Sequence, residues 1–197
     1  MRTMMMSATL VFGLFGFAAF SQAQKVNVEP NQKYLLLAAE RTSTVQQEID
    51  QAAAQGFRVL AGSPTSGSEM VLFLERVAQP PDTYTYRLIA TTNTGTFQKE
   101  LAAAAQEGFR LLPSTVVAKT SSAGRFLGGG RLGTEVVGVL ERAPKSTQKY
   151  EYRLLATTKT ATLQKEVSDA STAGFAVIGM VSRDEHMVIL EKETSSQ

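Results

Sequence analysis

The sequence predicts an α+β fold made of three tandem β-α-β-β repeats with mainly antiparallel sheets. Three observations support this prediction. Short motifs return in the same order along the chain, an alternating strand pattern gives way each time to a helical one, and a glycine–phenylalanine pair follows each helical stretch. These pairs are Gly56-Phe57, Gly108-Phe109 and Gly174-Phe175. Motifs that return at such spacing indicate one supersecondary unit used several times.

Each repeat opens with a predicted strand. In the second repeat, over 84–91, tyrosine and leucine alternate with threonine and arginine, and 150–157 repeats the pattern. Such a period of two is typical of a strand. The first copy, 34–38, is more diverged. The threonines that follow suit a helix start, because their hydroxyls can accept from unpaired backbone N–H groups. Ser43-x-x-Gln46 also has the spacing of a capping box.

The middle of each repeat has the periodicity of an amphipathic helix. Side chains recur at i, i+4, i+7 and i+8, which places them on one stripe. They are Val45, Ile49, Ala52 and Ala53, then Phe97, Leu101, Ala104 and Ala105, then Leu163, Val167, Ala170 and Ser171. The glycine just beyond each stripe predicts a left-handed C-terminal cap.

Two more strands follow each helix. The second begins at Phe57, Phe109 or Phe175, and the third spans 70–76, 136–142 or 187–192. The short loop between the last pair predicts a hairpin, whereas the helical crossover makes the first and second strands parallel. The simplest sheet therefore places the third strand in the middle, antiparallel to both neighbours.

The third strand is apolar on both faces, as Val71 and Phe73 opposite Leu72 and Leu74 illustrate. A helix covers only one face of a sheet, so another surface must cover the second. We expect helices on the outer faces and sheets packed together, with pseudo-threefold symmetry as one such arrangement. The alternative is that the second face is a binding surface.

The predicted organisation has short joints at Pro80-Pro81-Asp82 and Pro144-Lys145-Ser146, which favour packed rather than separate repeats. The segments are a signal peptide over 1–23, an N-terminal linker over 24–31, repeats over 32–78, 83–143 and 149–193, and a tail over 194–197.

The first residues have the layout of a secretory signal peptide. Arg2 precedes an apolar run over 4–20, and Ser21-Gln22-Ala23 places small residues at the −3 and −1 positions of a cleavage site. Cleavage near Ala23 predicts a secreted or periplasmic protein with no membrane segment afterwards; an uncleaved anchor helix is the alternative. The absence of cysteine excludes disulfides and a lipoprotein anchor.

Charge and composition argue against two classes of function. The formal net charge is +2, and Arg2 is the single charge of the predicted leader. Such a near-neutral balance, with acids and bases interleaved, lacks the basic stripe of a nucleic-acid-binding protein. No Gly-x-Ser-x-Gly motif is present, and one histidine cannot be matched with a nucleophile, so we expect no enzyme activity and no cofactor.

The order of these motifs resembles a bacterial domain of unknown function of about fifty residues. Members of that family typically read Tyr-Glu-Tyr-Lys-Val at the first strand and Gly-Trp-Glu-Leu after the helix. Residues 150–154 read Tyr-Glu-Tyr-Arg-Leu, and phenylalanine replaces the tryptophan in all three repeats. The resemblance implies the fold of the repeat and no catalytic residue.

Few side chains suggest chemistry. His186 is the one histidine and is expected in a polar hairpin turn beside Asp184 and Glu185 rather than in a metal or general-base site. Two sets of glutamates recur in register, and one set could converge on a cation in a threefold assembly. Otherwise the first set lies on a solvated helix face and the second forms cross-strand pairs with Arg or Lys neighbours such as Arg87 and Arg153. The sets are Glu48, Glu100 and Glu166, and Glu75, Glu141 and Glu191.

A glycine-rich insertion over 119–133 is the segment that the repeat pattern does not explain. We expect a long hairpin loop, and its candidate ligand or partner contacts are Arg125, Phe126, Leu127 and Arg131. The sequence thus predicts a non-enzymatic binding or structural module, with a protein partner bound through this loop as one option. The alternatives are a small-ligand or cation binder at the repeat interface, and an enzyme with a site under the loop.

Overall fold

The computed structural model describes residues 25–65, 67–77, 83–121 and 133–194. Within these ranges the chain is α+β, with three α-helices and three antiparallel sheets. The predicted signal peptide and the predicted joint at Pro80-Pro81-Asp82 lie outside the described residues.

The first sheet is formed by β1 (Tyr34–Ala39), β2 (Phe57–Pro64) and β3 (Met70–Arg76), with α1 (Thr42–Ala53) between β1 and β2 in sequence. Its strand order is β1-β3-β2, and β3 pairs antiparallel with both neighbours. The predicted central position of the third strand is confirmed here.

The third sheet has the same topology. It contains β8 (Lys149–Thr157), β9 (Ala176–Ser182) and β10 (His186–Thr194), in the order β8-β10-β9, with α3 (Thr160–Thr172) following β8 in sequence. Both pairings are antiparallel, so the last strand again lies in the middle.

The second sheet is built in the same way but its second strand is interrupted. It comprises β4 (Thr85–Thr91), α2 (Thr94–Gln106), β5 (Arg110–Leu111), a 3-10 turn η1 (Pro113–Thr115), β6 (Val117–Thr120) and β7 (Thr134–Arg142). The strand order is β4-β7-β5, and β6 also pairs with β7. Pro113 begins the interruption, since proline has no N–H for a strand ladder.

Two local predictions need correction. Lys119 and Thr120 belong to β6, so the loop predicted over 119–133 starts later than expected. A side-chain cap is found at α2, where Asn93 accepts from Thr96 N at 2.9 Å, and no side chain caps α1 or α3. The predicted glycine caps are confirmed, because the φ angles of Gly56, Gly108 and Gly174 are 85°, 86° and 88°.

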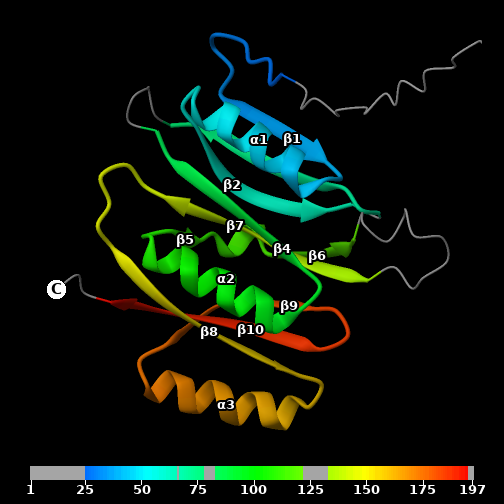
Figure 1. Ribbon diagram of the computed structural model, residues 1–197, viewed down its shortest axis with the longest axis vertical. Coiled ribbons are helices and arrows are strands. Elements are labelled where there is room, and N and C mark those ends of the chain that lie inside the picture. Colours follow the sequence, from blue (N-terminus) through cyan, green and yellow to red (C-terminus); the bar gives the residue numbers. More distant parts are fainter. Residues whose placement is uncertain (1–24, 66, 78–82, 122–132, 195–197) are drawn as a thin grey trace, which may run out of the picture.

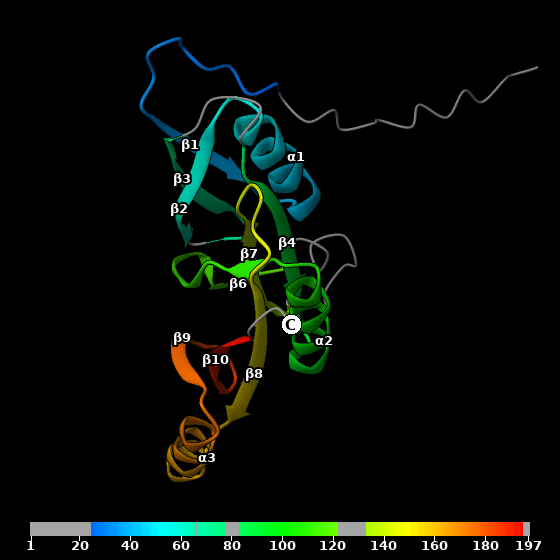
Figure 2. The same cartoon turned by 90° about the vertical axis from the view of Figure 1, so that its left-hand side faces the viewer.

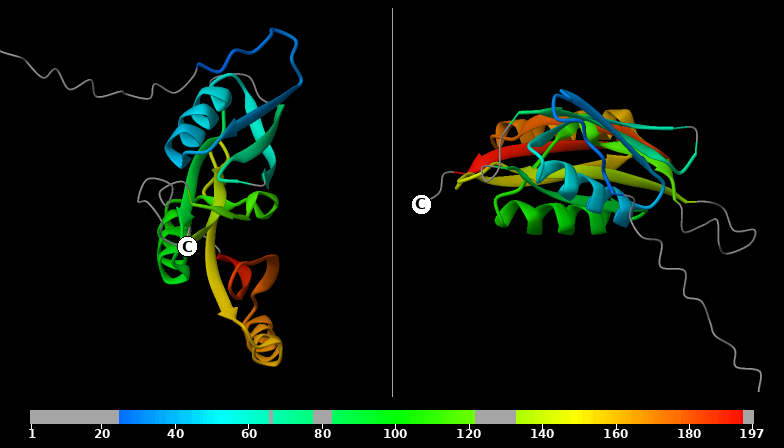
Figure 3. Two further views of the ribbon diagram at one scale, coloured as in Figure 1. Left: turned by 90° about the vertical axis from the view of Figure 1, so that its right-hand side faces the viewer. Right: turned by 90° about the horizontal axis from the view of Figure 1, so that it is seen from above.

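The three sheets follow one another along the long axis of the molecule, with the second between the first and the third (Figure 1). Figure 2 and the left view of Figure 3 show the same order from two sides. This arrangement differs from the pseudo-threefold assembly considered above. The helices also differ from the prediction, because α1 and α2 contact the first strand of the following sheet, β4 or β8, in addition to their own sheet.

Apolar side chains join each sheet to the next. One buried cluster unites α1 and the first sheet with Tyr86, Val137 and Val139 of the second, and another unites α2 and the second sheet with Tyr152, Met187 and Ile189 of the third. The central strands of the second and third sheets, β7 and β10, are thus covered on both faces, by their own helix and by the preceding part of the chain. A smaller cluster lies between α3 and the third sheet and contains Leu163, Ala170, Phe175, Val188 and Leu190.

Phe109→Ala should lower the free energy of unfolding by about 3–5 kcal/mol, because it leaves a cavity in the middle cluster. Phe109 is buried there, and the guanidinium groups of Arg87 and Arg142 each lie 4.8 Å from its ring centroid. Denaturant melts would measure the change. Leu36→Ala is the control, since Leu36 is 63% exposed, and an equal loss in both variants would contradict the assignment of the core.

Candidate functional site

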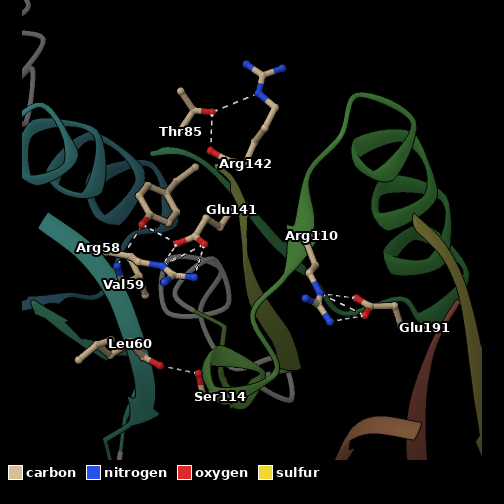
Figure 4. Close-up of polar contacts among 10 residues, drawn as sticks. Arg58, Val59, Leu60, Thr85, Arg110, Ser114, Glu141, Arg142 and Glu191 are labelled. Carbon is tan, nitrogen blue, oxygen red and sulfur yellow. Dashed lines mark hydrogen bonds and ion pairs between the residues drawn. The ribbon is translucent and has the colours of Figure 1, made fainter. Parts of the chain in front are cut away.

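A buried carboxylate ties the first sheet to the second (Figure 4). Glu141 is the penultimate residue of β7, and its side chain is 7% exposed. Arg58 of β2 donates to it through Nε at 2.9 Å and through Nη2 at 2.8 Å, while the Tyr86 hydroxyl donates at 2.8 Å. The same hydroxyl accepts from Val59 N at 3.1 Å. The carboxylate is therefore fully engaged by both sheets.

The second and third sheets are joined by the same contacts. Arg110 binds Glu191 of β10 through Nε and Nη2, the latter at 2.8 Å. The Tyr152 hydroxyl donates to Glu191 at 2.7 Å and accepts from Leu111 N at 2.8 Å. An arginine, a glutamate and a tyrosine thus form what we call the junction triad, once as Arg58, Glu141 and Tyr86 and once as Arg110, Glu191 and Tyr152.

Both tyrosines of the Tyr-x-Tyr motif contribute to a junction. The second one belongs to the triad, and the first one lies against the arginine of the same triad. The Arg58 guanidinium is 4.7 Å from the Tyr84 ring centroid, and that of Arg110 is 5.2 Å from the Tyr150 centroid. These are cation–π contacts, which hold the guanidinium plane beside the carboxylate.

A glutamine on each of the first two helices binds the edge of the next sheet. Gln46 of α1 donates to Tyr86 O at 3.2 Å and accepts from Leu88 N at 2.7 Å. Gln98 of α2 contacts Tyr152 O at 3.0 Å and Leu154 N at 2.7 Å in the same way. The amide side chain therefore pairs with the edge of β4 or β8 as a neighbouring strand would. Gln46 serves this purpose instead of the predicted capping box.

A cation completes each junction at its other end. Lys119 of β6 donates to Glu40 O at 3.1 Å and to Ser68 O at 2.7 Å, and it pairs with Glu135 Oε1 at 2.6 Å. Arg183 donates to Thr92 O at 2.6 Å and to Thr134 O at 3.3 Å. Glu40 and Thr92 hold the same register position, and so do Ser68 and Thr134. At both junctions, therefore, a basic side chain of one sheet donates to the same two carbonyl groups of the preceding sheet.

Burial controls the ionisation of the junction tyrosines. Desolvation, and then the negative charge of Glu141, raise the pKa of Tyr86 well above its ordinary value. Desolvation and the hydrogen bond to Glu191 do the same for the pKa of Tyr152. Both phenols therefore stay neutral and donate to carboxylates across the whole physiological range.

In the described residues no sheet precedes the first one, and its second face carries exposed apolar side chains. Tyr34, Leu36 and Phe73 are 45%, 63% and 37% exposed. In the register of the second and third sheets, the positions of Tyr34 and Phe73 are held by side chains that are at most 6% exposed, namely Tyr86, Tyr152, Val139 and Ile189. We call Tyr34, Leu36 and Phe73 the leading face.

The third sheet leaves the other half of a junction uncovered. Val177 of β9 is 52% exposed, whereas Val59 and Leu111 at the same register position are 2% and 0% exposed. Gln164 holds the position of Gln46 and Gln98 on α3, is exposed, and contacts Ser168 Oγ at 3.4 Å. We call Gln164, Val177 and the 57% exposed Met180 the trailing face.

A groove of about 280 Å³ lies next to both triads. Arg58, Arg110, Glu141, Ser146 and Tyr150 are among the residues that line it. Each arginine is committed to a glutamate through two of its nitrogens, so the charge of the groove is largely balanced. In the described part of the chain, no group of three or more acidic or histidine side chains is placed to hold a metal ion.

The predicted site residues have different outcomes. Arg125, Phe126, Leu127 and Arg131 lie outside the described residues. His186 follows the turn after β9, as expected, with Nδ1 3.1 Å from Ser182 Oγ.

The predicted cross-strand pairs of Glu141 and Glu191 with Arg87 and Arg153 are wrong. Arg87 binds Glu107, and the Arg153 guanidinium lies 4.7 Å from the Phe175 ring centroid. The arginines that bind the two glutamates instead come from the preceding sheet.

Sequence reasoning missed the roles of the glutamines and of the arginine that follows glycine–phenylalanine. The signal was present, because Gln46, Gln98 and Gln164 recur at one helical position. Arginine follows the phenylalanine in the first two copies and is replaced by Ala176 in the third, which belongs to the last sheet of the described residues. A side chain kept at junctions and lost at the end of the chain indicates a contact between units.

No protein-family model, curated protein or solved structure matches this chain. Among its described helices, none has both the length and the apolar character needed to cross a membrane.

Arg58→Ala and Arg110→Ala should each lower the free energy of unfolding by about 1–3 kcal/mol, because each leaves a buried carboxylate without its cation. The arginines are 40% and 50% exposed, which keeps the loss below that of a fully buried pair. Arg41→Ala is the control, since its side chain caps nothing. Equal melting midpoints for the control and the two variants would contradict the junction triad.

The free energy of unfolding should fall as the pH rises above 10. Unfolded tyrosine ionises near 10.0 while Tyr86 and Tyr152 keep their protons in the fold, so their contribution is complete below pH 10 and is lost above it. The slope from each is about 1.4 kcal/mol per pH unit. Denaturant melts between pH 8 and pH 11.5 would measure it. The slope should be shallower in Tyr86→Phe/Tyr152→Phe, and an unchanged slope would argue against the buried phenols.

Proposed function

We propose that this chain is a non-enzymatic binding or structural module that acts outside the cytoplasm, after removal of a signal peptide near Ala23. In this proposal it consists of three tandem β-α-β-β repeats of the small bacterial domain whose motifs it resembles. Each repeat shields one face of the next, and the leading face is the surface that binds a protein partner. Residues 1–23 support the location through their signal-peptide layout.

The single observation that carries this proposal is the exposure of the leading face. An aromatic pair, Tyr34 and Phe73, stacks there with ring centroids 5.3 Å apart, and Leu36 projects beside it. Exposed aromatic and leucine side chains grouped on one sheet are typical of protein interaction surfaces. Their counterparts in the other two sheets are protein contact surfaces within this same chain.

The structural role of the polar side chains supports a module without catalysis. Perturbed ionisation is a common sign of an active site, and Tyr86 and Tyr152 have it. Both hydroxyls, however, are used up by one glutamate and one backbone N–H each, which makes them parts of the junctions. The raised pKa values of the two tyrosines are therefore explained by their burial and hydrogen bonds at the contacts between sheets.

A photo-crosslinking amino acid tests the proposal. Benzoylphenylalanine at position 36 should give protein adducts on irradiation of the producing cells, and the same residue at Ala103, an exposed position on α2, should give none. The periplasmic or secreted fraction is the one to analyse, and mass spectrometry of the chain there should show Gln24 as its first residue. Equal adducts at both positions, or none at 36, would refute the proposed face.

A small ligand at the groove beside Arg58 and Arg110 is the second candidate, because two guanidinium groups line one hollow. Its ligand would be a small carboxylate or phosphate, which matches the geometry of arginine. A melting temperature that phosphate or acetate raises, and that sodium chloride at equal ionic strength does not, would favour this second function over the first.

A further inference from the structure

We propose that the leading face of one molecule binds the trailing face of a second copy, so that the protein assembles head to tail. This inference rests on the proposed role of the leading face and names its partner. The two junctions inside the chain use corresponding residues. The leading face has the residues that the following sheet contributes to such a junction, and the trailing face has the residues that the preceding sheet contributes.

The backbone edge of β1 fits the glutamine that α3 presents. Leu36 pairs with Phe73 in the register in which Leu88 pairs with Val139 and Leu154 with Ile189. The edge groups at Tyr34 O and Leu36 N therefore correspond to those that Gln46 and Gln98 bind. Gln32 Nε2 already donates to Tyr34 O at 2.9 Å, and a carbonyl oxygen has room for a second donor. Gln164 can thus bind β1 as its counterparts bind β4 and β8.

Apolar surface is complementary at the two ends. Docking would cover Tyr34, Leu36 and Phe73 with Val177 and Met180, all of which are exposed in the single chain. Ser171 replaces the buried Ala53 and Ala105 of the other helices, and it is small enough to allow the same close approach of helix and strand.

The charges of the two faces also match. Glu75 is the counterpart of Glu141 and Glu191, and Ala176 stands where an arginine would reach it from the preceding sheet. The cation is supplied instead by the same sheet, because Lys33 Nζ lies 3.5 Å from Glu75. At this position the internal junctions have Thr85 and Glu151, which offer no positive charge. The trailing face therefore lacks the arginine, and the Glu75 carboxylate of the leading face is already paired with Lys33.

One contact of the internal junctions is missing here, and its absence lowers the expected affinity. Thr65 holds the register position of Lys119 and Arg183, so the molecule that contributes the leading face has no cation there to bind the carbonyl groups beside the trailing face of the other molecule. The contact should therefore be weaker than the internal junctions and reversible. Because it joins two different faces, it extends into open chains unless the geometry closes a ring.

Sedimentation velocity of the purified chain over about 1 μM to 1 mM tests the assembly. We expect the average mass to rise with concentration beyond that of a dimer. Leu36→Glu and Val177→Glu should each abolish this rise, and an equimolar mixture of the two should form dimers and nothing larger, because one intact face of each remains. Both positions are more than half exposed, and circular dichroism would verify that the variants fold.

Two further substitutions examine the details of the contact. Gln164→Ala should weaken association about tenfold through the loss of two hydrogen bonds, and Glu166→Ala, on the opposite side of the same helix, should leave it unchanged. Thr65→Lys places a cation where the internal junctions have Lys119 or Arg183, and it should strengthen association about tenfold.

Three outcomes would overturn the inference. They are a wild-type chain and a Thr65→Lys variant that both stay monomeric, association that survives Val177→Glu, and a mixture that fails to form dimers. Crosslinks from position 36 to a different protein would also overturn it while leaving the proposed function in place. Crosslinks to residues of α3 and β9 in the same chain would support both.

Discussion

Glu141 and Glu191 set the constraint on which the arrangement of the sheets depends. A carboxylate that is almost completely buried must be paired and hydrogen-bonded, or folding is opposed by the cost of removing it from water. Each of the two obtains its arginine from the preceding sheet and its tyrosine from its own. Apolar burial supplies most of the stabilisation but has no direction. We infer that the triads fix which surfaces meet and in which register.

The glutamines act on the same principle at the strand edges. Gln46 and Gln98 satisfy backbone groups of β4 and β8 that would otherwise be left without partners beside a packed helix. To the next sheet each side chain donates one hydrogen bond and accepts one, which no apolar residue at that position could replace. Shape, charge and backbone pairing therefore select the same contact between successive sheets.

Sequence patterns predicted the elements better than their assembly. The strands, the helices, the glycine caps and the central third strand follow from local periodicity and from the short loops, which depend on residues close together in the chain. The linear order of the sheets does not, because it depends on pairs such as Arg58 and Glu141, which are 83 positions apart. Cross-strand pairing was expected for Glu141 and Glu191 since it requires only one sheet, and the structure instead uses two.

The candidate surface shows a similar limit. The sequence revealed that the third strand is apolar on both sides, and it left internal packing and external binding as alternatives. Internal packing covers β7 and β10 on each face, while β3 leaves Phe73 exposed. The order of the sheets along the axis determines which sheet is left uncovered. Local sequence patterns do not predict that order.

The small buried cluster beneath α3 has a consequence for how the molecule comes apart. Five buried side chains form it, whereas the two clusters between sheets are much larger and draw on two sheets each. In an elongated protein whose parts are stabilised by their neighbours, the end with the least support opens first and the middle last. Thermal denaturation would then proceed by fraying from the C-terminal end, with native and partly open forms in equilibrium well below the temperature at which the centre is lost.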